Sequence, residues 1–368
     1  MISIAHSSTV GIPGPVGPQG IVRLDLAENP YGPCPLALEA LHAAVLQPPS
    51  NVSTSLKQGL QRTYGANADS IVLFDCVESA VQAILNVFPG PVVTFPPSAN
   101  SAWFERNASE RTHVRLVRSP GRHGSLDSEV AADLPWDGIA LVESPSDPLG
   151  ALLRPVDAVR LARASRLVVI DERFSEFGGH SLLGFAREFD NVVILRSFDA
   201  WAGLPESPCG WAVASPSVAQ AIASALVGPE PEAMAAALAT LDSAEAMTVT
   251  LRLIREERSR LYRSLRKFAA FEPLPSWGPF ISARVGFGLR HDIVAALKAR
   301  NVMTHAPTEE GLEDYIRFGL GTRSSMEQLY AALRQIMPAI MDDASLIGCA
   351  DADCLSLRGE ELIEPEAG

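Results

Sequence analysis

The sequence predicts an α/β protein with a large domain on a mostly parallel sheet and a smaller C-terminal α/β domain. Short apolar runs of strand character alternate with stretches of helical periodicity over residues 35–230. A second, shorter set of such runs and helices follows before residue 345. The length of 368 residues is enough to bury two cores.

The N-terminal residues 1–34 are rich in Gly and Pro, which predicts an arm without regular helix or central strand. Helical spacing then marks residues 36–46 and 55–64. Seven short apolar runs are the candidate strands: 71–74, 92–95, 114–117, 139–142, 167–170, 192–195 and 211–214. Helical stretches separate several of them: 79–87, 156–164 and 218–226. Strands alternating with helices predict a parallel sheet that is covered on both faces.

Residues 231–345 are predicted to form a long helix and the small domain. Residues 233–268 keep helical periodicity without a proline, and their basic segment, 252–267, is typical of a solvated helix face. The small domain is expected from two strand-like runs and two helices: 280–285, 292–300, 315–320 and 325–340. Residues 346–368 are acidic and lack periodicity, so we expect a poorly ordered tail.

Composition excludes several classes of protein. A net charge of −13 argues against a nucleic-acid partner. No stretch approaches the roughly 20 apolar residues that cross a bilayer, and the start does not have the pattern of a signal peptide. The five scattered cysteines predict free thiols in a reducing cytoplasm, and Cys349 with Cys354 lacks the second ligand pair of a zinc site. We therefore expect a cytoplasmic protein without a metal site.

Five segments carry family-like motifs: LDLAENPYGPCP at 24–35, SPSDPLG at 144–150, LVVIDERF at 167–174, NVVILRSFDAWAGLPESPCG at 191–210 and IRFGLGT at 316–322. In this order they resemble pyridoxal-phosphate enzymes of the aspartate aminotransferase fold (fold type I), and most of all histidinol-phosphate aminotransferases. The resemblance covers about residues 20–340. It implies a seven-stranded, mostly parallel sheet sandwiched by helices, a small C-terminal α/β domain, and a homodimer with the active site at the subunit boundary.

The lysine that forms the Schiff base in this family is missing from the matching segment. Alignment without a gap places Ala200 at its position, and its neighbours are Asp199 and Trp201. The chain has three lysines, each in a stretch typical of a surface helix: Lys57, Lys267 and Lys298. A methyl group can neither form an imine nor carry a proton between carbons. We therefore expect no ordinary transamination.

The residues that hold the cofactor phosphate in the family are also replaced. Asp199 stands at the position of a Ser, Pro208 at that of an Arg, and Cys76 with Val77 at that of a Gly-Ser pair. Residues 32–63 contain no tyrosine to reach across a dimer. The sequence thus predicts that no cofactor is needed. The alternative is that pyridoxal or pyridoxamine phosphate binds without a covalent link.

Other positions match the family's site. The catalytic candidates are acids, of which the first matches the partner of the pyridine nitrogen: Asp171, Asp147 and Asp199. The candidates for substrate binding include the residue that matches the carboxylate-binding arginine: Arg317, Asn29, Tyr31 and Trp103. Structural roles are the alternatives, namely capping of a strand end by Asp171, a proline turn fixed by Asp147, and an ion pair of Arg317.

Three functions remain open. In the first, the old cavity binds a carboxylated, amino-acid-like molecule, and crowded carboxylates perform acid/base chemistry in a biosynthetic pathway without pyridoxal phosphate. In the second, the protein is a non-catalytic pseudoenzyme that serves as a partner or scaffold. In the third, a non-covalent cofactor supports a transferase or dehydratase reaction. Convergence of Asp171, Asp147 and Arg317 on an open pocket would favour the first, whereas filling of that space by Pro208 and Trp201 would favour the second.

Overall fold

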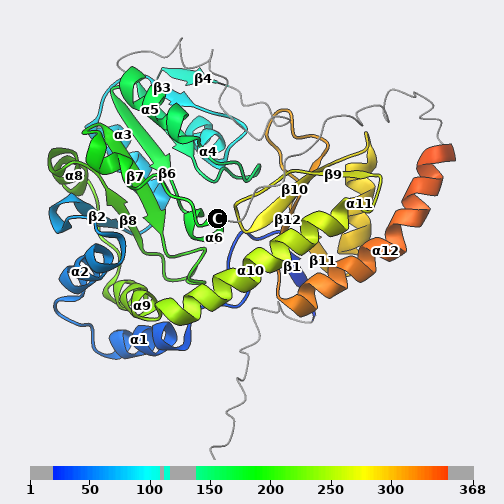
Figure 1. Ribbon diagram of the computed structural model, residues 1–368, viewed down its shortest axis with the longest axis horizontal. Coiled ribbons are helices and arrows are strands. Elements are labelled where there is room, and N and C mark those ends of the chain that lie inside the picture. The colour runs from blue at the N-terminus through cyan, green and yellow to red at the C-terminus, as the bar shows by residue number, and fades with distance from the viewer. Residues whose placement is uncertain (1–19, 108–111, 117–137, 347–368) are drawn as a thin grey trace, which may run out of the picture.

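The computed structural model describes residues 20–107, 112–116 and 138–346. Two sheet-containing parts lie side by side, and helix α10 (Ala244–Leu265) runs from one to the other (Figure 1). The first 19 residues of the expected arm and the expected tail from residue 347 lie outside the described residues, as do Cys349 and Cys354.

The large sheet has seven strands: β2 (Ile71–Phe74), β3 (Val92–Thr94), β4 (His113–Arg115), β5 (Ile139–Glu143), β6 (Leu167–Asp171), β7 (Val192–Ser197) and β8 (Gly210–Val213). Their order is β2-β8-β7-β6-β5-β3-β4. Strands β7, β6, β5, β3 and β4 pair in parallel, and β8 is antiparallel to both of its neighbours. The predicted seven-stranded, mostly parallel sheet is confirmed.

Both faces of this sheet are buried, as the sequence predicts. Along β6, Val168 and Ile170 join one apolar cluster, whereas Leu167 and Val169 join another. The second cluster contains side chains of α3 (Val77–Val87), α4 (Ala99–Asn107) and α8 (Pro216–Ala223). Helices that contribute to the first include α2 (Val52–Tyr64), α5 (Pro155–Ala164), α6 (Ser175–Gly178) and α7 (Phe185–Glu188). Helices α1 (Pro35–Leu46) and α9 (Pro231–Asp242) pack on each other and extend the first cluster beyond α2.

The smaller part contains an antiparallel sheet of order β12-β10-β9. Its elements are β9 (Phe271–Pro273), β10 (Phe280–Val285), α11 (Leu289–Lys298), β11 (Val302–Thr304), β12 (Tyr315–Gly319) and α12 (Arg323–Leu346). Strand β1 (Val22–Leu24) pairs in parallel with β11, so the N-terminal segment adds a short strand to the C-terminal part. The expectation of an irregular arm missed this strand, because three residues between Gly- and Pro-rich stretches carry little periodic signal.

The expected long helix at 233–268 is two helices, α9 and α10, which meet at Ser243. The basic face is not uniformly solvated either. Arg255 donates hydrogen bonds to the carbonyl oxygens of Glu176 and Phe177, and Arg258 donates to Phe177 and to the segment before β10. Burial lowers the pKa of Arg258 to about 10. For these two arginines the expectation of a solvated face was wrong, because they bind carbonyl oxygens at the junction of the two parts.

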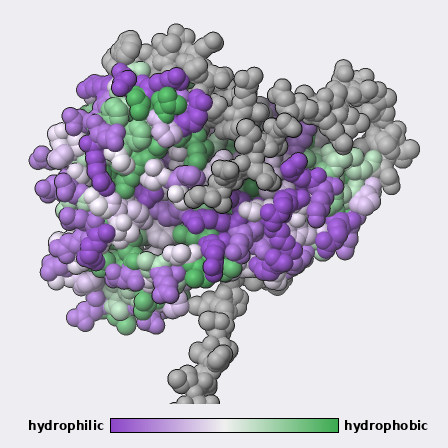
Figure 2. Space-filling model, viewed as in Figure 1, coloured by the Kyte–Doolittle hydropathy of each residue, from purple (hydrophilic) through white to green (hydrophobic). Residues whose placement is uncertain are grey.

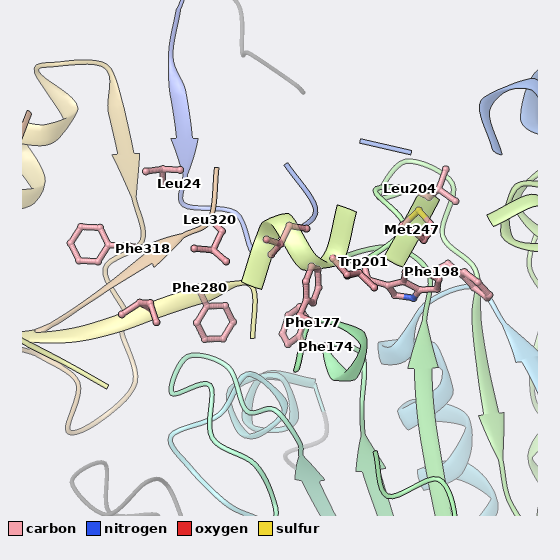
Figure 3. Close-up of a cluster of buried hydrophobic side chains, with 14 of the residues drawn as sticks. Leu24, Phe174, Phe177, Phe198, Trp201, Leu204, Met247, Phe280, Phe318 and Leu320 are labelled. Carbon is pink, nitrogen blue, oxygen red and sulfur yellow. The ribbon is translucent and has the colours of Figure 1, made fainter. Parts of the chain in front are cut away.

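A single apolar core runs through the junction of the two parts. Figure 3 shows Phe318 and Phe280 of the small sheet, Phe174 beside α6, and Phe198 with Trp201 after β7 as one succession of buried side chains. Figure 2 shows hydrophilic side chains gathered on the side of α10 and α12 that faces the viewer. The domain boundaries at residues 34, 230 and 345 stay a prediction.

Candidate functional site

The carboxyl ends of β5 and β6 bring two acidic side chains together. Glu143 and Asp171 are the last residues of these neighbouring parallel strands, and they face each other in the register. Both are buried, with exposed fractions of 4% and 1%. Ligand sites of parallel sheets lie at this edge, because the connections to the helices open there. The pair therefore marks the candidate site.

The carboxylate of Asp171 accepts hydrogen bonds from groups of the same chain. Its Oδ2 accepts hydrogen bonds from Arg173 Nε at 2.8 Å and from Asn100 Nδ2 at 3.2 Å. Its Oδ1 accepts one from the backbone N–H of Arg173 at 3.0 Å. The same guanidinium reaches Glu78 at the start of α3, where Nη1 lies 2.9 Å from Oε1. Both oxygens of Asp171 thus have charged or polar partners within the protein.

Glu143 fixes the start of α4. Its carboxyl accepts hydrogen bonds from the backbone N–H groups of Asn100 and Asp147. Burial, together with the neighbouring charge of Asp171, raises the pKa of Glu143 to about 8. Near neutral pH this side chain therefore carries a proton for most of the time, next to the ion pair of Asp171 and Arg173.

The guanidinium of Arg317 on β12 is paired with the carboxylate of Asp147 and is not directed into an empty space. Its Nη1 lies 2.6 Å from both carboxylate oxygens of Asp147, and its Nη2 donates to the carbonyl oxygen of Asp25 at 2.8 Å. The guanidinium also lies over the ring of Phe280, 5.2 Å from its centre. The side chain of Arg317 is 7% exposed and that of Asp147 is 20% exposed. The arginine that matches the family's carboxylate-binding residue is thus already paired with a carboxylate.

Replacement of Arg317 by alanine is expected to destabilise the protein by about 3 kcal/mol, because Asp147 loses its cation and Asp25 a hydrogen bond. Asp147→Ala alone leaves a buried arginine unpaired and is expected to cost a similar amount. The double variant should cost less than the sum of both by about 1–3 kcal/mol. Urea unfolding of the four proteins measures this coupling, and additive effects would mean that the two side chains do not stabilise each other.

The turn after β7 contains Ala200 and is tied to the N-terminal segment by Asn29. The N–H of Asn29 donates to the carbonyl oxygen of Ala200 at 2.8 Å, and its Nδ2 donates to that of Trp201 at 3.2 Å. Asn29 Oδ1 accepts the N–H of Tyr31 at 2.9 Å. Gly203 has a φ of +70°, and a Cβ there would come within 2.5 Å of the Gly32 backbone. The turn that contains Ala200 is thus closely packed, although residue 200 has only a methyl side chain.

Asp199 and Trp201 on either side of Ala200 are also engaged. Asp199 Oδ1 accepts the N–H of Cys209 at 3.0 Å, and burial raises the pKa of the Asp199 carboxyl. The ring of Trp201 packs on Phe198 at 5.5 Å between centres and belongs to the apolar core (Figure 3). Trp201 therefore fills apolar space beside the turn.

Some of the predicted site residues contact one another in the structure, and others lie apart. Asp147 contacts Arg317 directly, and Asn100 connects Asp171 with Glu143. Trp103 packs against the apolar cluster on the α3 face of the sheet, and Tyr31 packs half-buried against the other cluster. The catalytic and binding roles of the candidates stay predictions.

Four residues of this network were not recognised in the sequence: Glu143, Arg173, Asn100 and Glu78. Two of them carried a readable signal. Glu143 ends an apolar run, where a parallel strand points its last side chain toward a ligand edge. Arg173 is the variable residue of the segment DERF, two positions after Asp171, and it therefore emerges on the same side as that carboxylate. Asn100 and Glu78 are connected to the site only through tertiary packing.

Asp75 lies next to the N-terminus of α3, the helix start that matches the family's phosphate-binding segment. Its Oδ1 accepts the N–H of Cys76 at 2.7 Å and also the hydroxyl of Ser79. The side chain of Val77 is buried in the core. A carboxylate of the chain thus takes one of the donors that a phosphate would use.

Within the described residues, no helix is long and apolar enough to span a membrane. The same part of the chain has no cluster of three or more His, Cys, Asp or Glu side chains suited to a metal ion. Cys34, Cys76 and Cys209 are free thiols, as expected for these three.

No family model matches the chain. A histidinol-phosphate aminotransferase of Dehalococcoides mccartyi is 26% identical over 324 residues, which cover 86% of this chain and 90% of the relative. The structure of histidinol-phosphate aminotransferase from Clostridium acetobutylicum is 18% identical with a TM-score of 0.77, over 86% of this chain and 99% of that one. That from Sinorhizobium meliloti, solved in complex with pyridoxal-5'-phosphate, is 22% identical with a TM-score of 0.76, over 87% and 92%.

Three observations define the class of protein fold: the order of the seven strands, the small antiparallel sheet and these matches. The chain has the fold of the fold type I aminotransferases, which confirms the fold that the resemblance in the sequence implied. In sequence it is similar to histidinol-phosphate aminotransferases.

The expectation that no cofactor belongs to this site is contradicted. The relatives are aminotransferases, and the Sinorhizobium meliloti enzyme was solved with pyridoxal-5'-phosphate, so the comparisons indicate pyridoxal phosphate rather than none. The reasoning from sequence took the replacement of individual contact residues as the loss of the ligand, although the fold is similar over 86–87% of the chain.

The described residues fit pyridoxal phosphate only in part. A buried carboxylate, Asp171, is present for a protonated pyridine nitrogen, and α3 begins at Val77, in the segment that matches the family's phosphate-binding helix start. Against this, Arg173 is bound to Asp171, Asp75 accepts the N–H of Cys76 before α3, and residue 200 has no amine. The three lysines lie elsewhere: Lys57 on α2, Lys298 on α11 and Lys267 just after α10.

Proposed function

We propose that this protein is a histidinol-phosphate-aminotransferase-like protein that does not transaminate and that binds pyridoxal phosphate or pyridoxamine phosphate reversibly. The observation that carries the proposal is the side chain of residue 200. It is a methyl group in the turn after β7, and the carbonyl oxygen of the same residue is fixed by Asn29. Without an amine at this turn, any cofactor is held by non-covalent contacts alone.

The second ligand of the proposed site is a carboxylated, amino-acid-like molecule. Arg317 supplies a planar pair of donors for its carboxylate, and the pairing with Asp147 shows that the guanidinium accepts a carboxylate in this position. A ligand would have to displace Asp147, which is 20% exposed and can move toward solvent. Catalysis of another kind at this site would use the protonated carboxyl of Glu143 as an acid.

A scaffold without a small-molecule ligand is the second candidate function. The observation that favours it is that Asp171 and Arg317 are both neutralised within the chain, while Trp201 is part of the apolar core. A homodimer in the cytoplasm is proposed for either function from the family resemblance and from the composition of the chain.

The proposal predicts that the purified protein gives no amino transfer between histidinol phosphate and 2-oxoglutarate with added pyridoxal phosphate. Borohydride treatment with excess cofactor should leave no label specific to Lys57, Lys267 or Lys298, because none lies at the turn after β7. Peptide mass spectrometry and an amino-transfer assay measure both, with the Sinorhizobium meliloti enzyme treated in parallel as the positive control. Turnover together with a reducible lysine adduct would disprove the proposal.

Equilibrium dialysis separates the two candidate functions. Reversible uptake of about one pyridoxal phosphate per chain supports the ligand-binding function. Absence of uptake at millimolar cofactor would support the scaffold function.

A further inference from the structure

Arg173 contacts residues at both ends of the candidate cofactor position. Its Nε donates to Asp171, which matches the partner of the pyridine nitrogen, at 2.8 Å. Its Nη1 donates to Glu78 at 2.9 Å, and Glu78 follows Cys76 and Val77 at the start of α3. Cys76 and Val77 match the phosphate end of the site. The guanidinium therefore connects the residue that matches the pyridine end with the helix start that matches the phosphate end.

The contact with Asp171 uses the same hydrogen-bond acceptor that a protonated ring nitrogen would need. Asp171 Oδ2 already receives Arg173 Nε and Asn100 Nδ2, and Oδ1 receives the N–H of Arg173. A carboxylate whose two oxygens already accept three hydrogen bonds, one of them from an arginine side chain, has little capacity for a further charged donor. A cationic heterocycle would meet the guanidinium instead of the acid.

The guanidinium is able to leave without breaking the core. Its side chain is 24% exposed and that of Glu78 is 41% exposed, whereas Asp171 is 1% exposed. Glu78 lies at the surface end of the pair, so Arg173 can swing toward Glu78 and solvent while Asp171 stays in place. Asp171 then has a single remaining side-chain donor, the neutral amide of Asn100.

Resting on the proposed function, we infer that Arg173 is an internal occupant of the pyridine subsite and determines which ligands the site accepts. A ligand with a protonated aromatic nitrogen and a phosphate, such as pyridoxal phosphate, binds by displacing Arg173 from Asp171. The guanidinium stands in for the ring cation in the free protein and weakens binding by competing with it.

The test is pyridoxal phosphate affinity of the full chain, measured by equilibrium dialysis. Arg173→Ala is expected to bind the cofactor at least tenfold more tightly than the unaltered protein. Arg160→Ala is the matched control: it removes an arginine from an ion pair with Asp157, on α5, and should leave the affinity unchanged. The double variant Arg173→Ala/Asp171→Asn should lose the gain, because the pyridine nitrogen has no carboxylate left to bind.

Arg173→Gln keeps a hydrogen-bond donor to Asp171 without the charge, so it tests the same point if the alanine variant does not fold. It should bind the cofactor more tightly than the unaltered protein and less tightly than a folded alanine variant. Equal or weaker binding by folded Arg173 variants, with measurable binding by the unaltered protein, would overturn the role of Arg173 alone. Absence of binding by all folded variants would overturn the proposed ligand as well.

Discussion

Replacement of Arg196 by methionine is expected to lower the free energy of unfolding by about 3–5 kcal/mol, because it leaves buried carboxylates without their cation. Arg196 lies on β7 with 4% exposure. Its Nε is 3.3 Å from Glu172 Oε2 and its Nη1 is 3.2 Å from Glu176 Oε1. These two carboxylate side chains are 1% and 10% exposed. Burial already raises the pKa of Glu172, and only Arg196 and a few hydrogen bonds oppose that rise.

Packing contributes only a minor part of the loss in the methionine variant. The guanidinium lies 5.0 Å from the centre of the Tyr64 ring and 5.7 Å from that of Trp211, so it also fills space between aromatic side chains. Methionine is shorter than arginine but flexible and apolar, and it carries no charge. The variant therefore keeps most of the packing volume, and the loss reports mainly the unpaired acids.

Guanidinium chloride unfolding measures the effect, and Arg252→Met is the control. Arg252 is 66% exposed and lies 4.0 Å from Glu256, so its loss should change stability by no more than about 0.5 kcal/mol. Adding Glu172→Gln to Arg196→Met should recover part of the loss, because the buried charge disappears. Equal stability of the Arg196 and Arg252 variants would show that the buried pair does not contribute.

The fold could be predicted from the sequence because most strands of the large sheet are short, mostly apolar and separated by helices. Residues 71–74 are a strand with the predicted bounds, and 139–142 and 167–170 are each one residue short. What could not be predicted depends on contacts distant in the sequence. Strand β1 exists because it pairs with β11 about 280 residues later. The break between α9 and α10 at Ser243 has neither a proline nor a glycine to mark it.

From the sequence one could select residues of the candidate site, but not predict which of them pair with each other. Matching of motifs selected Asp171, Asp147 and Arg317; the structure has Asp171 at the end of β6, and Asp147 in contact with Arg317 of β12. The matching could not show that Asp147 and Arg317 bind each other, since 170 residues separate them. Nor could it show that Asp171 is neutralised by Arg173, because a family motif leaves that position undefined.

These pairings have a common physical origin. A buried carboxylate or guanidinium without a partner is costly, so charges buried at this site have to be compensated by other groups of the chain. Asp171 with Arg173 and Arg317 with Asp147 are compensated in this way. Glu143 is the exception, because its side chain has backbone N–H donors but, among the described residues, no cation in direct contact.

The free energy of unfolding is therefore expected to fall as the pH rises from about 4.5 to about 8, because in this range Glu143 is protonated in the folded protein and ionised in the unfolded chain. Its pKa is raised from 4.5 to about 8 by burial and by Asp171. Between these values the folded protein holds one proton more than the unfolded chain, so the free energy of unfolding decreases with pH, by at most about 1.4 kcal/mol per unit from this group. Below 4.5 both states are protonated, and above 8 both are ionised, so the contribution is constant there.

Glu143→Gln removes this titration and should make the protein more stable than the unaltered chain by about 3–4 kcal/mol at pH 8.5. The amide keeps one oxygen as an acceptor for Asn100 or Asp147, and loss of the other costs about 1 kcal/mol, which is included in that figure. Well below pH 4.5 the order should reverse, because the carboxyl is then neutral in both states and keeps both hydrogen bonds. Urea unfolding across this range measures the crossover, with Glu105→Gln on the exposed side of α4 as the control. Parallel pH profiles of the Glu143 and Glu105 variants would mean that Glu143 is ionised in the folded protein, and that a cation or a ligand then stabilises it.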